Sequence, residues 1–334
     1  MRDVAQTAGV SIKTVSRVVN DEPGVTPALE ARVRDAVERL GYQPDDRARY
    51  LRRTAGTSRR SATIGFVQMD VANPFFSAMF RGLEDAAKAN GSLVLAGSSD
   101  ADPVRQDELI DTFVARRVDG LVIATRRGDL ETLDRELRHG TPVVFVDQEP
   151  PALVGDVVRT DHRGGATIAT RHLIDHGHRR IAFLGDDPEL FSAAERRAGF
   201  LDVMAAAGLR APLVETGVVD TATAAATTER LLDLPEPPTA LFTAQNLITV
   251  GALIALHRHG LADRVALVGF DEIDAAELIH PRPTVIPQDP RRIGRLAGER
   301  LFARLAGDTD PPGRTILEPQ LIPRGSGEIR PPAT

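Results

Sequence analysis

The sequence predicts a small helical head followed by a larger α/β body built from parallel sheets. A length of 334 residues exceeds what one ordinary hydrophobic core contains, so we expect more than one domain. The first 60 residues carry 12 Lys and Arg against 8 Asp and Glu, whereas the remainder carries 29 against 39. From Thr63 onward, short β-branched runs alternate with helical stretches, which is typical of an α/β fold.

The composition limits the class of protein. Hydrophobic residues make up 42% and charged residues 26%, as in soluble globular proteins. We expect no membrane span, because no apolar run approaches the ~18 residues that one requires. The first residues lack the basic-then-apolar pattern of a secretory signal. The absence of cysteine excludes disulfides and thiolate metal sites and is compatible with a reducing cytoplasm.

The head has the pattern of three short helices. The segment "DVAQTA" predicts a helix that ends at Gly9, and Ser11 can cap a second helix that continues to Val19. Thr26 and Pro27 suit the start of a third helix. Its apolar stripe is predicted to comprise Leu29, Val33, Val37 and Leu40. Two helices joined by a glycine turn and braced by a third form a helix-turn-helix unit.

The second helix has two distinct faces. Lys13, Arg17 and Asn20 are spaced to share one face, opposite the valines. Cationic side chains suit guanine edges in the major groove of DNA. The alternative is a solvated amphipathic helix, but the tight turn, the brace and the basic head favour DNA recognition.

The segment "DVAQTAGVSIKTVSRVVN" resembles the signature "DVA..AGVS..TVSR.LN" of the lactose-repressor (LacI/GalR) family of bacterial transcription regulators. The resemblance implies a helix-turn-helix DNA-binding domain over residues 1–45. It also implies that operator bases are read by Ile12, Lys13 and Arg17. By the same resemblance, phosphate contacts that set register come from Ser11, Thr14, Ser16, Asn20 and Thr26.

The segment "GYQPDDRARYLRR" continues the resemblance and implies a hinge helix and linker over residues 46–61. Leu51 takes the position of the leucine that the family inserts into the minor groove, and Ala48 lies one turn earlier. Without the upstream signature, Leu51 would be read as a packing residue. The arginines of "RRTAGTSRRSA" either contact phosphates or belong to a solvated linker, which we favour. The chain begins almost at its first helix, which leaves open whether the native start lies upstream.

The body contains strand-like runs separated by helical stretches of 12–18 residues. The runs are "TIGFVQM", "SLVLAG", "GLVIAT", "PVVFVD", "RRIAFLG", "TALFTA" and "VALVGF". This pattern predicts parallel sheets covered on both faces, arranged as two Rossmann-like lobes. Small ligands bind such sheets beyond the carboxyl ends of the strands.

No catalytic constellation is present in the body. It lacks a phosphate-binding glycine loop, a nucleophile elbow and an HExxH metal signature. The histidines of "HLIDHGH" are expected at the surface. We therefore expect no enzyme, no catalytic residue, no metal and no cofactor. Two other classes of protein share an α/β body. A sugar-metabolising enzyme would require a catalytic site, and a transporter's solute-binding protein would require a secretion signal and would have no use for the basic head.

The body also resembles the family, through segments such as "NPFFSAMFRGLEDAAKANG" and "ERRAGFLDVMAAAGL". The resemblance implies a two-lobed effector-binding and dimerisation domain over residues 62–334, similar to periplasmic sugar-binding proteins. It places the N-lobe at about 62–159 and 291–316 and the C-lobe at about 162–288 and 319–326. Three crossovers are expected near 159–162, 288–291 and 316–319.

The effector-binding residues are carried over from the resemblance. They are Phe75, Phe76, Met79, Thr125, Asp147, Arg196, Val219, Gln245 and Asp271. Carboxylates and amides suit paired sugar hydroxyls, and arginine supplies a fixed fork of donors. Alternatively, the two phenylalanines belong to the lobe core and the two aspartates cap turns. Arg196 is the strongest candidate.

Two departures affect the choice of effector. "FTAQNL" supplies Gln245 and Asn246 where many members carry Asn-Asp, and Val219 replaces a frequently aromatic residue. The effector is therefore not restricted to a monosaccharide: it can also be a disaccharide, a polyol, a nucleoside or another small metabolite. The sequence predicts a cytoplasmic homodimeric repressor that binds a near-palindromic double-stranded DNA operator and a carbohydrate-like effector, without a membrane partner. Whether the effector acts as inducer or corepressor is open.

Overall fold

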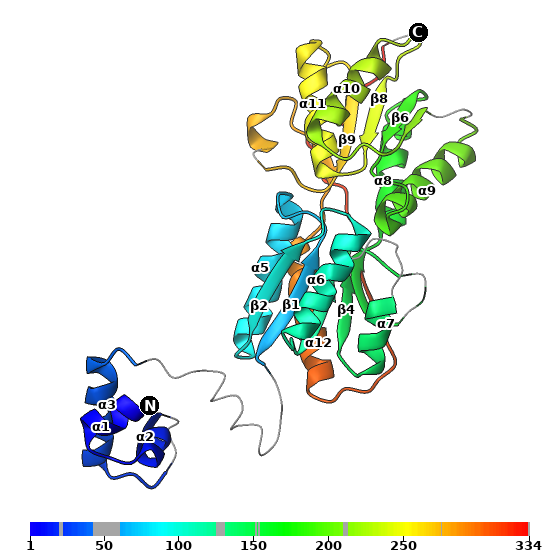
Figure 1. Ribbon diagram of the computed structural model, residues 1–334. Coiled ribbons are helices and arrows are strands. Elements are labelled where there is room, and N and C mark those ends of the chain that lie inside the picture. Colours follow the sequence, from blue (N-terminus) through cyan, green and yellow to red (C-terminus); the bar gives the residue numbers. More distant parts are fainter. Residues whose placement is uncertain are drawn as a thin grey trace. The chain divides into compact units, whose positions relative to one another are not determined.

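The computed structural model describes residues 1–19, 23–42, 61–124, 131–150, 152, 154–209, 213–274 and 276–332 (Figure 1). The chain forms two compact units, Met1–Ser61 and Ala62–Thr334. The predictions for Asn20, Ala48, Leu51 and Thr125 lie outside the described residues.

The head contains three helices, α1 (Arg2–Ala8), α2 (Ile12–Val19) and α3 (Pro27–Arg39). Gly9 ends α1 with φ 60°, a left-handed conformation that glycine adopts without strain. Arg32 of α3 donates a hydrogen bond to the carbonyl oxygen of Ala8 at 2.6 Å and so joins the first and third helices. The core of the head consists of Val4, Ala5, Ala8, Val15, Val18, Val33 and Ala36.

The predicted stripe of α3 is wrong at its end. Val33 is fully buried, but Leu40 is 46% exposed, and Ala36 takes its place in the core. Leu40 is the C-cap residue of α3 and lies at the end of the helix, beyond the residues that form the core of the head.

The N-lobe of the body is a six-stranded parallel sheet in the order β11-β5-β4-β3-β1-β2. Its strands are β1 (Thr63–Gln68), β2 (Leu93–Ser98), β3 (Gly120–Ile123), β4 (Val143–Val146), β5 (Asp156–Thr160) and β11 (Arg314–Leu317). Its helices are α5 (Pro74–Ala89), α6 (Pro103–Ala115), α7 (Glu131–Arg138) and α12 (Pro290–Leu305). Side chains of α5 and α12 pack on one face of the sheet, and those of α6 and α7 pack on the other.

The C-lobe is a five-stranded parallel sheet in the order β10-β9-β8-β6-β7. Its strands are β6 (Ile181–Leu184), β7 (Leu213–Glu215), β8 (Ala240–Thr243), β9 (Ala266–Phe270) and β10 (Thr284–Ile286). Its helices are α8 (His162–Asp175), α9 (Phe191–Ala206), α10 (Thr221–Leu232), α11 (Asn246–Arg258) and the short 3₁₀ helix η1 (Ala276–Leu278). Helices α8 and α9 cover one face of the sheet, and α10 and α11 cover the other. Two sheets of this kind confirm the predicted α/β fold class.

The chain passes between the lobes three times. It leaves the N-lobe after Thr160 and returns between Ile286 and Pro290. It leaves again after Leu317, because Ile322 pairs with Val285 of the C-lobe. Each of the four apolar clusters of the body lies within one lobe. Among the described residues, no apolar cluster therefore includes side chains from both lobes.

Two features of the body differ from the expectation. The strands β5, β7, β10 and β11 are not among the seven runs chosen from the sequence, because they are short or interrupted by charged residues. His178 is fully buried rather than at the surface. Its ring nitrogens contact Thr239 Oγ1 at 2.9 Å and the Ile329 carbonyl oxygen at 2.7 Å, which ties the C-terminal segment to the lobe. Among the helices described, none is long and apolar enough to span a bilayer.

The close crossing of α5 and α12 gives a prediction about stability. A Cβ at Gly294 would lie 1.9 Å from the carbonyl oxygen of Met79, so Gly294→Ala forces the helices apart. We expect a loss of roughly 1–3 kcal/mol or more in the free energy of unfolding, measured by chemical denaturation. Gly313→Ala is the matched control, because a Cβ there meets nothing within 4 Å. Equal stability of the two variants would contradict this packing.

Candidate functional site

The second helix of the head presents a mixed surface. Ile12 and Lys13 are exposed and Arg17 is half-buried, while Val15 and Val18 face the core. The three residues predicted to read bases therefore have side chains outside the core.

The residues predicted to contact phosphate differ in availability. Ser11 Oγ accepts a hydrogen bond from the Thr14 amide at 3.1 Å and lies 2.9 Å from Thr14 Oγ1, so both hydroxyls already serve the start of α2. Ser16 is half-buried. Thr26 is exposed, and its hydroxyl makes no capping bond to α3. In the described part of the head, the Thr26 hydroxyl is therefore not used to cap α3.

In the body, two aspartates occupy corresponding places in the two lobes. Asp147 directly follows β4 and Asp271 directly follows β9, with φ angles of 60° and 72°. A residue with a side chain adopts this left-handed region only at a cost. Strained positions of this kind cluster at functional sites. Both aspartates lie at carboxyl ends of parallel strands, where such sheets bind ligands.

Arg196 of α9 is held by three contacts. Its Nη1 donates to the carbonyl oxygen of Ala244 at 2.7 Å, and its Nη2 donates to His162 Nδ1 at 3.2 Å. Its guanidinium carbon lies 4.0 Å from the ring centre of Phe270. The side chain is only 4% exposed, and its Nε has no hydrogen-bond partner among the described residues. Two of the five N–H groups of the guanidinium are therefore bonded to these two acceptors, and the N–H on Nε is not.

The contacts of His162 define its protonation state. Arg196 only donates, so Nδ1 must accept, and the proton lies on Nε2, which donates to the Asp147 carbonyl oxygen at 2.9 Å. Burial lowers the pKa of His162 well below its usual value, and the charge of Arg196 lowers it further. His162 is therefore neutral and links the start of α8 to the loop after β4.

Asp147 is a buried carboxylate beside this histidine. Its Oδ2 accepts from Gln148 Nε2 at 2.6 Å, while Oδ1 has no hydrogen-bond partner in the described part of the chain. Burial raises the pKa of Asp147; Arg196 opposes the rise, and the nearby charge of Asp271 adds to it. The Gln148 side chain also reaches Ser192 Oγ of the C-lobe at 2.7 Å.

A second group of contacts surrounds Asp271. Its Oδ1 accepts from Gln288 Nε2 at 2.7 Å, and its Oδ2 accepts from the Asn246 amide at 3.3 Å. The side chains of Asn246 and Asn73 form a reciprocal pair, with N···O distances of 2.9 and 3.2 Å. Asn73 also caps α5 through the Phe75 amide at 3.0 Å. The starts of α5 in the N-lobe and α11 in the C-lobe are thus joined directly.

Two cavities adjoin this polar cluster. The larger has a volume of about 620 Å³ and is lined from the N-lobe by Asn73 and Phe76 and from the C-lobe by Val219 and Gln245, among others. Gln245 Nε2 donates to Asp186 Oδ2 at 3.3 Å at its edge. The smaller, about 180 Å³, is lined in part by Phe75, Asn246, Asp271 and Gln288.

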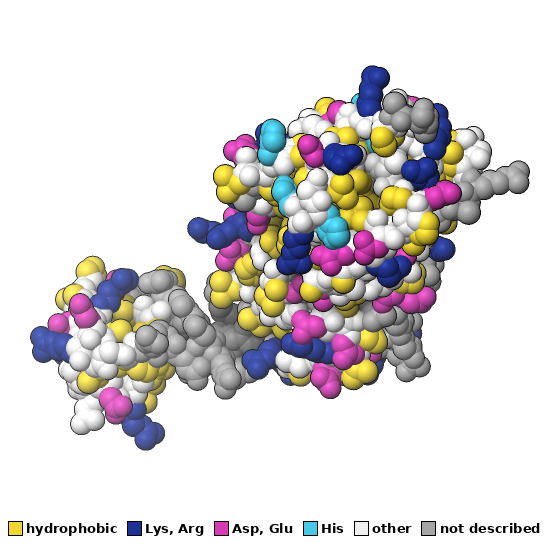
Figure 2. All heavy atoms as spheres, turned by 90° about the horizontal axis from the view of Figure 1, so that it is seen from above, with side chains coloured by type: hydrophobic (Ala, Val, Ile, Leu, Met, Phe, Trp, Pro, Cys, Tyr) yellow, Lys and Arg dark blue, Asp and Glu magenta, His cyan; other side chains and the backbone are white. Residues whose placement is uncertain are grey.

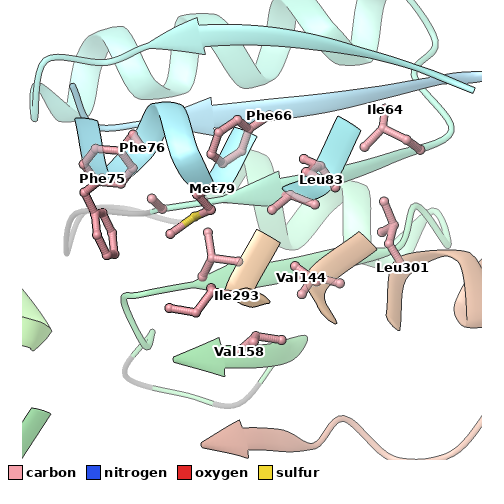
Figure 3. Close-up of a cluster of buried hydrophobic side chains, with 14 residues drawn as sticks. Ile64, Phe66, Phe75, Phe76, Met79, Leu83, Val144, Val158, Ile293 and Leu301 are labelled. Atoms are coloured by element: carbon pink, nitrogen blue, oxygen red, sulfur yellow. The ribbon is translucent and has the colours of Figure 1, made fainter. Parts of the chain in front are cut away.

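Met79 lies apart from both cavities. It is fully buried in the N-lobe core with Phe66, Val144 and Ile293, and it lines neither cavity (Figure 3). Phe75 and Phe76 belong to the same apolar cluster but also line the cavities, whereas Met79, one turn further along α5, is enclosed in the core. Val219 is 53% exposed and lines the larger cavity.

The sequence analysis missed several members of the cluster. Gln148, His162, Ser192 and Gln288 were not chosen, and Asn246 was noted only beside Gln245. Asp147, Gln148, His162 and Gln288 all lie where strands end or the chain crosses between lobes, which is the signal that could have identified them.

Comparison with known proteins agrees with both parts of the chain. Residues 1–45 match the model of bacterial regulatory proteins of the lacI family, and residues 170–327 match the periplasmic binding protein-like domain. The chain is 30% identical to the HTH-type transcriptional repressor CytR of Escherichia coli K12, over 99% of this chain and 97% of CytR. It is 32% identical to the ribose operon repressor of the same strain, over 98% of this chain and 99% of the repressor. The chain belongs to the lacI family.

Solved structures of lacI-family proteins share this architecture. The Lac repressor dimer bound to operator and the anti-inducer ONPF is similar over 97% of this chain and 98% of its own, with a TM-score of 0.82 and 25% identity. The transcriptional regulator CelR in complex with cellobiose is similar over 97% of this chain and 98% of the CelR chain, with a TM-score of 0.72 and 30% identity. Both relatives are transcriptional repressors, and this agrees with the prediction that the chain is a transcription regulator and not an enzyme.

The neutral state of His162 gives a prediction about pH. Its pKa is lower in the folded than in the unfolded chain, so stability is lost as pH falls below the unfolded value of about 6.5. The expected slope is at most about 1.4 kcal/mol per pH unit for this residue. His162→Gln keeps a donor and an acceptor but cannot be protonated, so its melting temperature falls less between pH 6.5 and 5.

His178→Gln is the matched control for this experiment, because burial also lowers the pKa of His178. We expect His162→Gln to flatten the pH profile more, since His162 is more deeply desolvated and faces Arg196. A profile as steep as that of the unsubstituted protein would show that His162 is protonated in the folded chain.

Proposed function

We propose that this chain is a cytoplasmic homodimeric repressor that binds a near-palindromic operator through α2 and a small-molecule effector between the lobes of its body. The observation that carries the proposal is its similarity to two transcriptional repressors over 97–99% of their length, which includes both the head and the body.

For DNA, the support is the surface of α2. Ile12, Lys13 and Arg17 lie on the side of the helix away from Val15 and Val18, which is the side that a recognition helix turns to the major groove. The predicted hinge at Ala48 and Leu51 remains part of the proposal, as does the boundary of the hinge segment at residues 46–61.

For the effector, the support is the buried polar cluster with the two cavities beside it. Asp147, Arg196 and Asp271 come together there, each buried to at least nine-tenths. Three polar atoms of this cluster lack hydrogen-bond partners among the described residues. They are Asp147 Oδ1, Arg196 Nε and Gln288 Oε1. Such atoms are costly to bury unless a ligand or water satisfies them. Phe76, Val219 and Gln245 line the larger cavity and Phe75 the smaller.

For the dimer, the support is the exposed apolar surface of the body. Leu93 and Leu95 of the edge strand β2 are 74% and 39% exposed, and Leu278 of η1 is 87% exposed. An exposed edge strand with large apolar side chains requires a cover. A second copy of the chain would match the twofold symmetry of a near-palindromic operator.

The experiment is a fluorescence anisotropy titration with DNA fragments from the region upstream of the protein's own gene. A preference of about 10³-fold or more over scrambled DNA is expected for an operator. Arg17→Ala is expected to lose about 1–3 kcal/mol of that preference and to keep salt-sensitive background binding. Arg39→Ala is the control, because this exposed arginine lies on α3 and pairs with Asp35. An unchanged preference in Arg17→Ala would show that α2 does not read the bases.

A further inference from the structure

The C-lobe contains a further cavity of about 420 Å³, the distal cavity. Three of the residues that line it, Arg180, Thr239 and Val265, directly precede the strands β6, β8 and β9. Ala244 and Asp271 of the polar cluster follow the carboxyl ends of β8 and β9, so the distal cavity lies at the opposite ends of the same parallel strands. Among the described residues, it shares no lining residue with the two cavities beside that cluster.

The walls of the distal cavity are apolar and rigid. They are formed by Leu232, Pro237, Pro238, Leu261, Val265 and Pro332. The ring of each proline fixes its backbone φ angle, which limits how far the walls can collapse into the space. Figure 2 looks onto this end of the body and shows exposed hydrophobic side chains with basic side chains beside them. A concave, mostly apolar surface of this volume is typical of a small-molecule site.

The charges at the rim of the distal cavity have the opposite balance to the body as a whole. Arg180, Arg264 and Arg330 line it against one carboxylate, that of Asp263. The chain after residue 60 carries 29 Lys and Arg against 39 Asp and Glu. In the part of the chain that the structure describes, none of the three arginines forms an ion pair with a carboxylate. Their charges are therefore available to an anion from solution.

Two of these arginines are held beside the cavity by the fold. Arg180 Nε donates a hydrogen bond to the Pro237 carbonyl oxygen at 3.1 Å, which anchors the guanidinium to the cavity wall. Arg330 follows Ile329, whose carbonyl oxygen lies 2.7 Å from Nε2 of His178. Because His178 is fully buried, the C-terminal segment is fixed at this point and Arg330 stays at the rim.

Arginines above apolar walls suit a ligand with two kinds of surface. The guanidinium group presents a planar fork of N–H donors that matches the oxygens of carboxylate and phosphate groups. The walls remove an apolar group of the same ligand from water. We propose that the distal cavity is a second ligand site, which takes a small molecule that joins an apolar body to a carboxylate or phosphate head group. This site is separate from the proposed effector site.

The test uses the full chain with ¹³C-labelled leucine and valine methyl groups, observed by nuclear magnetic resonance. Leu261 and Val265 report on the distal cavity, and Val219 reports on the larger cavity between the lobes. The probes are naphthalene-2-carboxylate and 2-naphthyl phosphate, with the uncharged naphthalene-2-carboxamide as reference. We expect the anions to shift the Leu261 and Val265 signals with a Kd of about 1 mM or tighter, and the amide to bind at least about fivefold more weakly.

The anion that binds more tightly identifies the preferred head group. Three results would overturn the proposal. They are shifts confined to Val219, equal binding of the anions and the amide, and no shift of Leu261 and Val265 up to about 10 mM of either anion.

Variants connect the preference to the rim. Arg264→Gln combined with Arg330→Gln removes two of its cations and leaves Arg180 in place. We expect this variant to bind the anions at least about fivefold more weakly and the amide unchanged. The matched control combines Arg171→Gln with Arg197→Gln, two exposed arginines of α8 and α9 that do not line the cavity. Either an equal loss in the control or undiminished anion binding in the first variant would contradict the proposed recognition.

Discussion

The body depends on three polar contacts that cross from one lobe to the other. His162 at the start of α8 contacts the Asp147 carbonyl oxygen, Gln148 contacts Ser192, and Asn73 pairs with Asn246. All of these side chains are buried to at least nine-tenths. Since the apolar clusters stop at the lobe boundary, these contacts hold the lobes against each other together with the three chain crossovers and the packing of Arg159 on the Phe191 ring.

A polar boundary of this kind suits a protein that responds to a small molecule. Each hydrogen bond contributes only about 0.5–1.5 kcal/mol net, and a ligand that supplies its own donors can replace one at little cost. An apolar interface of the same area would resist such an exchange, because separating it exposes surface to water. A few kcal/mol of differential binding is then enough to shift the arrangement of the lobes, and coupling of about 1–3 kcal/mol is usual for allosteric proteins.

The sequence predicted the order of elements better than the members of the site. Apolar runs such as those of β4 and β9 identified the sheets, because fully buried parallel strands are continuously hydrophobic. The family resemblance supplied Asp147 and Asp271, each of which directly follows one of these runs. His162 and Gln148 also lie just beyond strand ends, but the runs alone do not show their roles, which come from contacts with residues at a distance in the chain. Met79 lies in the core of the N-lobe together with Phe75 and Phe76, and its contact with an effector stays a prediction.

The most direct test of this account is the distance between the lobes, measured by pulsed electron paramagnetic resonance. The chain has no cysteine, so spin labels at Lys88→Cys on α5 and Ala205→Cys on α9 report on exposed sites in the two lobes. Gln148→Ala with Asn246→Ala removes two of the cross-lobe contacts, while Gln245 still caps α11. The account predicts a broader or shifted distance distribution in this variant. An unchanged distribution would contradict it, because the lobes would then be held by something other than these contacts.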